Sequence, residues 1–428
     1  MSARQRQQIA YGLLGLPLAF AALPIAIHLP TLYSEQVGLS LTLIGALLLL
    51  VRGVDAITDP LLGWLADRYP QRRRWMVAAL PLLAAALVAL LTPPAEAGAG
   101  WLLLQLLLVT FALSITTINY YAWGAEVGCS DTDRTAFVAA REGSALFGVM
   151  LAAALPSLLA DQQALALERL SWLFLPLLLL CAVITLRYAP APPPVIPNLA
   201  PESPWRGLRS ALGHHQFRQL LLLFAINGTA AAIPATTLLF YVEHILQRPE
   251  QSGLLLLLYF AAAALSLPLW SRLAARYGKP HSWLMAMALA ISSFGWAALL
   301  GAGDLLPFAA ICLLAGIAVG ADLMLPPALL ADLIATETDP PTGRWFGWWN
   351  LVTKANLALA AGIALPLLGL FGFTPERSDN STTALLALSA TYALLPLLLK
   401  LLAMWLLWHL PPLTTPPTPT PQPLPEPS

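Results

Sequence analysis

Long apolar stretches recur along the whole chain, separated by short polar or proline-containing segments. Twelve can be marked: 9–33, 39–66, 75–92, 101–125, 136–159, 170–188, 217–242, 253–272, 281–301, 305–332, 345–372 and 383–409. A run of about 20 apolar residues can cross the ~30 Å hydrocarbon core of a bilayer as a helix. The chain lacks the alternating ten-residue pattern typical of a membrane β-barrel. The pattern therefore predicts an all-α polytopic membrane protein with twelve transmembrane helices.

The segment between the sixth and seventh stretches divides the chain into two halves. It reads APAPPPVIPNLAPESPWRGLRSALGHHQ, and its prolines bar a continuing helix. We expect a six-helix bundle over residues 1–188, a cytoplasmic linker over 189–216 and a second six-helix bundle over 217–409. The proline-rich residues 410–428 are expected to be a disordered tail.

A short internal repeat supports this division. Arg68, Tyr69 and Trp75 in the first half recur as Arg276, Tyr277 and Trp283, each 208 residues later. Such repeats are the sequence trace of two bundles that hold a solute between them near the middle of the membrane.

Composition and charge agree with a membrane location. The chain is 58% hydrophobic and 10% charged, with a mean hydropathy of +0.72. Its net charge is zero, which argues against a nucleic-acid partner. Fifteen of the 22 lysines and arginines fall in loops on the side of the N-terminus and three on the opposite side. This bias predicts a multi-pass protein of the cell (inner) membrane with both termini in the cytoplasm.

The sequence offers no signature of a catalytic or metal-dependent enzyme. The three cysteines are scattered and form no CxxC pair. Neither HExxH nor GxSxG occurs, and the pair His214-His215 lies in the linker. We therefore expect no enzymatic activity and no cofactor.

Charged residues inside the second apolar stretch are its most informative feature. Arg52, Asp55 and Asp59 are separated by three and four residues, which places them on one helix face. A carboxylate near the bilayer centre costs about 2.5–3.5 kcal/mol on insertion scales. One interpretation is a fixed ion-pair cluster, with Arg52 neutralising one aspartate and Lys354 the other. The other is a coupling site that alternately binds a small cation, sodium or a proton.

Other polar residues within the apolar stretches allow two interpretations each. Arg141 could pair with a carboxylate such as Glu126, or it could grip a solute. Lys354 lies too deep in its apolar stretch for its side chain to reach the membrane surface. Lys400 lies near the end of the last stretch, and its side chain is expected to reach the surface. The aromatic residues of NYYAWGAE, among them Trp123, could form a sugar platform or anchor the helix at the interface.

The segment GWLADRYPQRRR also has two interpretations. Its arginines satisfy the positive-inside bias, which is sufficient to explain them. We favour a gating latch, because an aspartate interrupts an otherwise basic loop. In this latch Gly63 allows close helix packing and Asp67 accepts charged hydrogen bonds from a neighbouring helix, with Arg68 and Arg72 beside it.

These residues resemble a known family. The spacing Gly63-x-x-x-Asp67-Arg68-x-x-x-Arg72-Arg73 is similar to the loop signature of the major facilitator superfamily. More narrowly, DAITDPLLGWLADR, YAWGAE and ADLIATETDPPTGRWFGWWNLVTKANLALAAG resemble the glycoside–pentoside–hexuronide:cation symporters. The resemblance covers nearly all of the chain except the tail, and it implies the major facilitator fold.

The resemblance also implies roles for individual residues. Those implied for the cation site, which would be a sodium site if the ion is not a proton, are Asp55, Asp59, Thr58 and Thr116. Those implied for the solute pocket are Asn119, Trp123, Arg141 and Lys354. Arg52 and Lys354 would be charge partners of the two aspartates.

Two departures from the family pattern affect solute recognition. Sugar-binding members carry an aspartate on the first helix, where this chain has Pro17, and another on the fourth, where it has Asn119. Cation-coupled symport of a small solute, a sugar or glycoside, is the function that the resemblance implies, by a monomer in the bilayer. Proton-coupled export of an amphipathic or lipid-like compound is the alternative. A membrane receptor or enzyme would not explain ionisable residues deep in both halves.

Overall fold

The protein consists of helices joined by short connections. The computed structural model describes residues 1–193, 203–337, 341–375 and 380–409. Its α-helices are α1 (Ala3–Gly12), α2 (Gly15–Ile27), α3 (Leu29–Gln36), α4 (Leu41–Arg68), α5 (Arg72–Leu91), α6 (Ala99–Val127), α7 (Asp131–Leu159), α8 (Gln163–Tyr188), α9 (Pro204–Gly213), α10 (His215–His244), α11 (Ser252–Tyr277), α12 (Lys279–Phe294), α13 (Leu305–Thr336), α14 (Thr342–Leu370), α15 (Thr382–Ser389) and α16 (Leu395–His409).

The predicted fold class is confirmed. Twelve helical segments of the described chain are long and apolar enough to cross a membrane, and each overlaps one of the twelve stretches marked in the sequence. The first stretch, predicted as one helix over 9–33, is instead divided among α1, α2 and α3. Pro24 lies inside α2 and Pro30 is the second residue of α3, and neither has a backbone N–H to donate to the helical hydrogen bonds.

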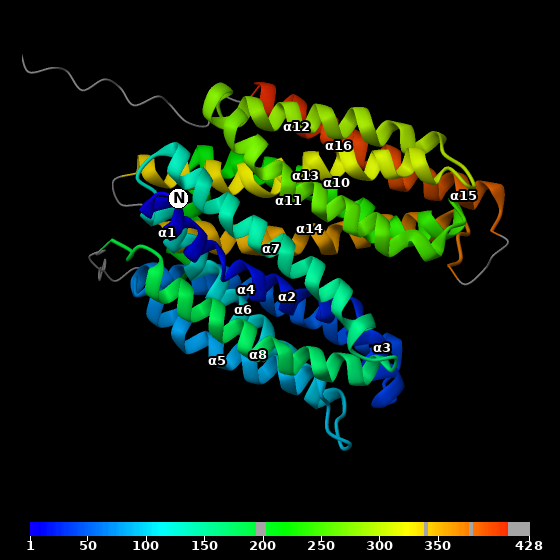
Figure 1. Cartoon of the computed structure of the whole chain (residues 1–428), viewed down its shortest axis with the longest axis horizontal. Helices are drawn as coiled ribbons and strands as arrows, with labels where there is room; N and C mark the ends of the chain where they lie inside the picture. The colour runs from blue at the N-terminus through cyan, green and yellow to red at the C-terminus, as the bar shows by residue number, and fades with distance from the viewer. Residues whose placement is uncertain (194–202, 338–340, 376–379, 410–428) are drawn as a thin grey trace, which may run out of the picture.

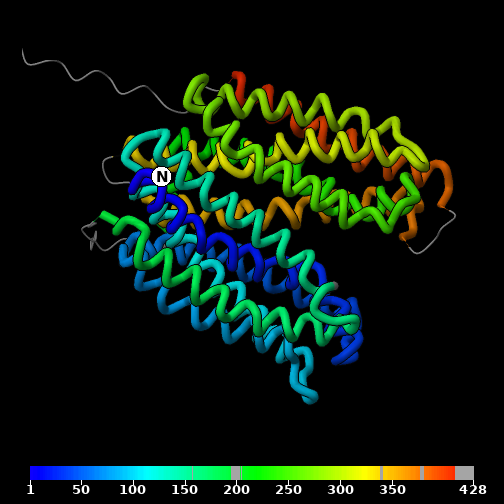
Figure 2. The backbone as a smooth tube through the Cα atoms, in the orientation of Figure 1, coloured from blue at the N-terminus to red at the C-terminus, as the bar shows by residue number. Residues whose placement is uncertain are grey.

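The helices form two groups that follow the order of the chain. In Figure 1 the blue-to-green helices α1–α8 lie below and the green-to-red helices α10–α16 lie above. The groups are close together at the end that holds α1 and diverge toward the end that holds α3 and α15, as the tube in Figure 2 shows. Packing between the groups pairs α4 with α14 and α7 with α11 and α13.

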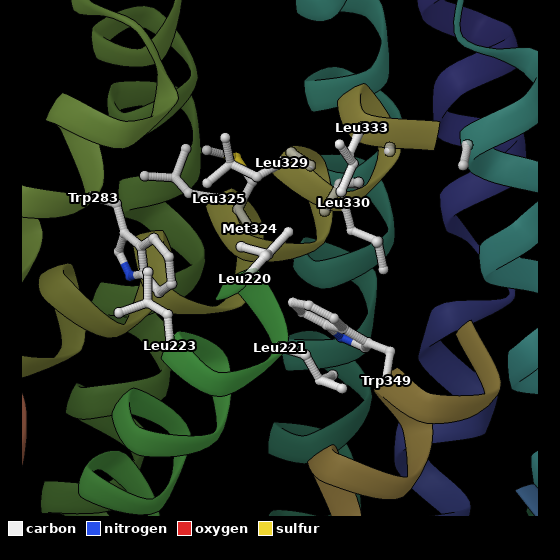
Figure 3. Packing of buried hydrophobic residues seen from close by; sticks show 14 of the residues in the cluster. Leu220, Leu221, Leu223, Trp283, Met324, Leu325, Leu329, Leu330, Leu333 and Trp349 are labelled. Carbon is white, nitrogen blue, oxygen red and sulfur yellow. The ribbon is translucent and has the colours of Figure 1, made fainter. Parts of the chain in front are cut away.

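Two large apolar clusters make up most of the core. In the first group, one cluster runs through α1–α8 and includes Tyr11, Phe20 and Phe174, all essentially unexposed. For the second cluster, Figure 3 shows Leu223 of α10 and Leu325 of α13 beside Trp283, and Trp349 of α14 beside Leu221. The second cluster also includes Ala66 of α4 and Leu146 of α7, so it joins the two groups. The exact bundle boundaries stay a prediction.

The linker contains a helix that the sequence pattern did not predict. The prolines after α8 do end it at Tyr188, but a new helix, α9, begins with Pro204 at its first position, where proline is tolerated. The helix buries Leu208 and Ala211 against the bundle and contacts α4, α10 and α14. The predicted tail, 410–428, lies outside the described residues.

Helices α4 and α14 cross in close contact at glycines. A Cβ on Gly63 would meet the carbonyl oxygen of Gly343 and lie 3.0 Å from the Cα of Gly347. Gly45 lies 18 residues earlier in α4, which places it on the same face, yet no heavy atom lies within 4 Å of a Cβ built there. The two helices therefore touch near Gly63 and are apart near Gly45.

This difference predicts unequal effects of the same substitution at two positions. Gly63→Ala should lower the midpoint of thermal unfolding in detergent, because the added methyl overlaps backbone atoms that cannot rotate away, at a cost of about 1–3 kcal/mol. Gly45→Ala is the matched control and should leave the midpoint unchanged or raise it slightly. Equal midpoints for the two variants would contradict the close crossing.

Candidate functional site

The two buried aspartates of α4 meet a lysine of α14. Lys354 Nζ lies 3.1 Å from Asp55 Oδ2 and 2.9 Å from Asp59 Oδ2. Asp59 is fully buried and Asp55 nearly so, whereas 18% of the Lys354 side chain is exposed. One ammonium group therefore contacts both carboxylates of the other half of the molecule. The fixed ion-pair interpretation assigned Lys354 to one aspartate, whereas in the structure Lys354 contacts both and Arg52 also approaches Asp55.

Two further side chains join this cluster. Ser114 Oγ of α6 accepts a hydrogen bond of 2.8 Å from Lys354 Nζ, and Asn350 Nδ2 of α14 donates one of 2.9 Å to Asp59 Oδ2. Sequence reasoning missed both residues. Asn350 lies four residues before Lys354 and so on the same helix face, which is a signal that could have found it. No comparable signal in the sequence marked Ser114, because serine is common in apolar helices.

Asp55 is less well satisfied than Asp59. Its Oδ2 atom is buried and receives no hydrogen bond, although Lys354 lies 3.1 Å away. Arg52 Nη1 approaches the same oxygen only to 3.7 Å, and 44% of the Arg52 side chain is exposed. A buried carboxylate oxygen without a donor is costly and is available to a further positive group.

Thr58 and Thr116 are not turned toward the carboxylates. Thr58 Oγ1 lies 3.5 Å from the carbonyl oxygen of Asp55, and Thr116 Oγ1 donates to the carbonyl of Ala112 at 2.8 Å. The oxygens around Lys354 Nζ are Asp55 Oδ2, both carboxylate oxygens of Asp59 and Ser114 Oγ. Such hard oxygen ligands suit sodium, and carboxylates also accept protons. No group of three or more histidine, cysteine or acidic residues arranged for a metal occurs among the described residues.

Of the four residues implied for a solute pocket, Lys354 belongs to this cluster, whereas Arg141, Asn119 and Trp123 have other partners. Arg141 donates to Glu142 Oε1 at 2.8 Å and lies 3.6 Å from the ring centre of Tyr121. Its expected alternative partner, Glu126, instead binds Arg72. Asn119 donates to the carbonyl of Ile115, and its own carbonyl oxygen is buried without a donor.

Trp123 is enclosed within the first bundle. Its indole N–H donates to the carbonyl of Pro190 at 2.9 Å, Arg73 packs over its ring, and it has no exposed surface. In this state Trp123 is therefore not accessible to a solute.

The segment after α4 closes one end of the molecule. Asp67 accepts hydrogen bonds from the backbone N–H groups of Gly343 at 2.5 Å and Arg344 at 2.9 Å. These groups belong to the first turn of α14, where N–H groups have no partner within the helix and the helix dipole favours an anion. The Arg344 side chain also lies 3.3 Å from Asp67. We call this contact between the two halves the latch.

Arg72 supports the latch, whereas Arg68 lies outside it. Arg72 is buried and lies 3.3 Å from Asp67 and 2.7 Å from Glu126. It also donates to the carbonyl of Ala66 at 2.7 Å, so its position is fixed from three sides. The Arg68 guanidinium lies over the ring of Trp64.

A second ionic contact joins the halves near the same ends of their helices. Arg134, near the start of α7, donates to Asp332, near the end of α13, at 2.7 Å. Lys279 of α12 contacts the other oxygen of Asp332. Sequence reasoning did not single out Asp332. Two contacts therefore join the halves at this end. One is made by Asp67 of the first half and the other by Asp332 of the second half.

The expectation that Lys400 reaches the membrane surface is wrong. Its ammonium group is buried and lies 2.7 Å from Asp322 Oδ2 and 2.9 Å from Asn227 Oδ1. Asp322 also accepts hydrogen bonds from Asn227 and Trp283. An aspartate near the middle of the apolar stretch 305–332 was the signal for such a partner. Because every charge in this group is paired inside the second bundle, it serves to hold α10, α12, α13 and α16 together.

Comparison with known proteins places the chain in a family. A family model described as MFS/sugar transport protein matches residues 10–414. The inner membrane symporter YicJ of Escherichia coli (strain K12) is 26% identical over 242 residues, which is 53% of this chain and 51% of YicJ. The match thus spans about half the length of that relative. The sodium-dependent lysophosphatidylcholine symporter 1-A of Danio rerio is 20% identical over 75% of this chain and 70% of its own length.

Solved structures agree on the fold. The human organic anion transporter MFSD10 superimposes with a TM-score of 0.70 at 20% identity, covering 95% of this chain and 100% of that one. The fucose:proton symporter FucP of E. coli superimposes with a TM-score of 0.67 at 13% identity, covering 94% and 98%. The chain therefore belongs to the MFS/sugar transport protein family of the major facilitator superfamily, as its resemblance to the glycoside–pentoside–hexuronide:cation symporters predicted.

Proposed function

We propose that this protein is a secondary active transporter that moves a small solute together with a sodium ion or a proton. The observation that carries the proposal is the bridge from Lys354 of one half to Asp55 and Asp59 of the other. Charges this deep in a membrane are rare and are typical of ion pathways and coupling sites. That the relatives are named as symporters supports the same reading.

Coupling follows from competition for the two carboxylates. In the state described here the Lys354 ammonium contacts both. A sodium ion or proton that arrives at Asp55 and Asp59 removes the need for the lysine, and the attraction between α4 and α14 weakens. Because these helices belong to different halves, the occupancy of the site shifts the equilibrium between arrangements of the halves, as alternating access requires.

The solute is a sugar, a glycoside or a lipid-like compound. The family description favours a sugar, and the named relatives include a lysophosphatidylcholine symporter. Pro17 and Asn119 replace the two aspartates expected of a galactoside site. Proton-coupled export of an amphipathic compound is the second candidate function, because export of such a compound does not need these two aspartates.

The orientation proposed from the charge bias places both termini and the latch in the cytoplasm. The state with the latch closed then loads from outside, as it must for import. We propose a monomer in the cell (inner) membrane, with the coupling ion in place of any cofactor. Neither a nucleic acid nor an enzymatic reaction enters this proposal.

A thermal-shift screen tests coupling and identifies the solute class. The purified protein is heated with sugars, glycosides, organic acids or lysophospholipids, in sodium or choline salts, at acidic and alkaline pH. A bound solute should raise the unfolding midpoint more when the coupling cation is present, since each ligand favours the state that binds the other.

Asp59→Asn should abolish this cation dependence, because a neutral amide neither holds a sodium ion nor takes up a proton. Asp161→Asn, at an exposed aspartate between α7 and α8, is the matched control and should retain it. Cation dependence that persists in the Asp59 variant would exclude this site as the coupling site.

The latch can be tested by a distance measurement across the halves. Asp67→Asn replaces the carboxylate that binds the first turn of α14, and hydrogen bonds to a charged group are worth about 1.5–3 kcal/mol. We expect a longer distance between spin labels placed at Arg74→Cys and Arg276→Cys, two exposed positions of opposite halves, in a Cys129→Ser background. An unchanged distance distribution, with Asp161→Asn as the control, would show that the latch does not hold this end closed.

A further inference from the structure

Arg52 occupies an unusual position for an arginine. It lies near the middle of α4 (Leu41–Arg68), and therefore near the middle of a membrane-spanning helix. It precedes Asp59 by seven residues and Gly63 by eleven, which places all three on one face. Gly63 touches α14, so this face is turned toward the other half of the molecule.

The space in front of Arg52 is where the two halves part. Gly45, also on this face, has no heavy atom within 4 Å of a Cβ built there. On α14, Leu365 lies 18 residues after Gly347 and so on the face that touches Gly63, yet it is 45% exposed. The exposed guanidinium group of Arg52 therefore faces the region between the halves. It is not turned toward lipid.

The guanidinium group is also chemically available. Arg52 donates no hydrogen bond to any residue that the structure describes, and its one ion pair there is the 3.7 Å approach to Asp55. Asp55 has a nearer cation in Lys354, whose ammonium lies 3.1 Å away. A planar fork of N–H donors without acceptors is suited to the bidentate binding of a carboxylate or a phosphate ester.

The charges of the cluster indicate when an anion would bind. Arg52 and Lys354 balance Asp55 and Asp59, so the empty site is neutral, and Arg141 is paired separately with Glu142. Adding a sodium ion or a proton leaves one positive charge in excess. An unmatched charge in a medium of low dielectric constant is costly, and a monoanion next to Arg52 removes it.

We propose that Arg52 binds the anionic group of a monoanionic solute, so that cation and solute enter as a neutral pair. This inference rests on the proposed coupling site and adds the class of solute. Cation binding strengthens anion binding because it supplies the missing charge, and the reverse holds by linkage. Co-transport in equal numbers then moves no net charge.

The electrical potential beside Arg52 can be measured with charged thiol reagents. Ala56 is exposed and lies one turn after Arg52. In a Cys129→Ser background, Ala56→Cys is reacted with anionic sulfonatoethyl or cationic trimethylammonioethyl methanethiosulfonate. We expect the ratio of anionic to cationic rates to rise when sodium replaces choline, or on acidification. Arg52→Gln should lower the ratio about tenfold, as expected for loss of a unit charge several ångströms away. Arg52→Lys, which keeps the charge, should preserve it.

The outcomes separate this inference from the proposed function. A ratio unaffected by Arg52→Gln, or an introduced thiol that reacts with neither reagent, would overturn the anion site whatever the cation does. If the ratio of anionic to cationic labelling rates depends on Arg52 and not on the cation, cation binding is not coupled to anion binding at Arg52. That result would also overturn the proposed cation site.

Protection of the introduced thiol identifies the anionic group. Slower labelling of the Ala56→Cys variant in the presence of glucuronate would assign a carboxylate, and slower labelling with lysophosphatidylglycerol a phosphate ester. Equal protection by glucose or monoacylglycerol, their uncharged counterparts, would refute the preference for an anion.

Discussion

Two carboxylates buried in a membrane need positive charge beside them, and in this protein the ammonium group that contacts both comes from the opposite half of the chain. Asp55 and Asp59 belong to α4, and Lys354 belongs to α14. Removing one partner of a buried ion pair typically costs about 3–5 kcal/mol, because the remaining charge is left unmatched. The same contact therefore stabilises the folded protein and fixes the relation between its halves.

Contacts along α4 and α14 change in character from one end to the other. Asp67 accepts hydrogen bonds from the first turn of α14, and Gly63 then lets the two backbones touch. The cluster around Lys354 follows, and beyond it the helices separate. The cluster around Lys354 thus lies where the contact between α4 and α14 ends. A change of charge there changes the attraction between the two helices, and this can lengthen or shorten the part over which they touch.

The sequence predicted the arrangement within helices better than the contacts between them. Hydropathy located the twelve spans, and the spacing of Asp55 and Asp59 placed them on one face, because both follow from helix geometry. Two contacts could not be predicted in this way: that of Lys354 with both aspartates and that of Lys354 with Ser114. Both depend on which helices pack together, and the spacing of residues along a single helix does not contain that information. Lys400 shows the same limit: its distance from the end of the span suggested the membrane surface, but Asp322 on another helix holds it inside. The helix α9 was missed because its prolines were read as breaking helices, whereas Pro204 begins one.

The central claim is that a mobile cation and the tethered ammonium of Lys354 compete for the same two carboxylates. The most direct test is the cation affinity of purified Lys354→Gln, measured by binding of radioactive sodium and by titration of proton uptake. If the claim is correct, this variant binds the coupling cation more tightly than the unaltered protein, because the competing charge is gone and two carboxylates are left to share one site. Weaker or unchanged binding would contradict the claim and would assign Lys354 a purely structural role.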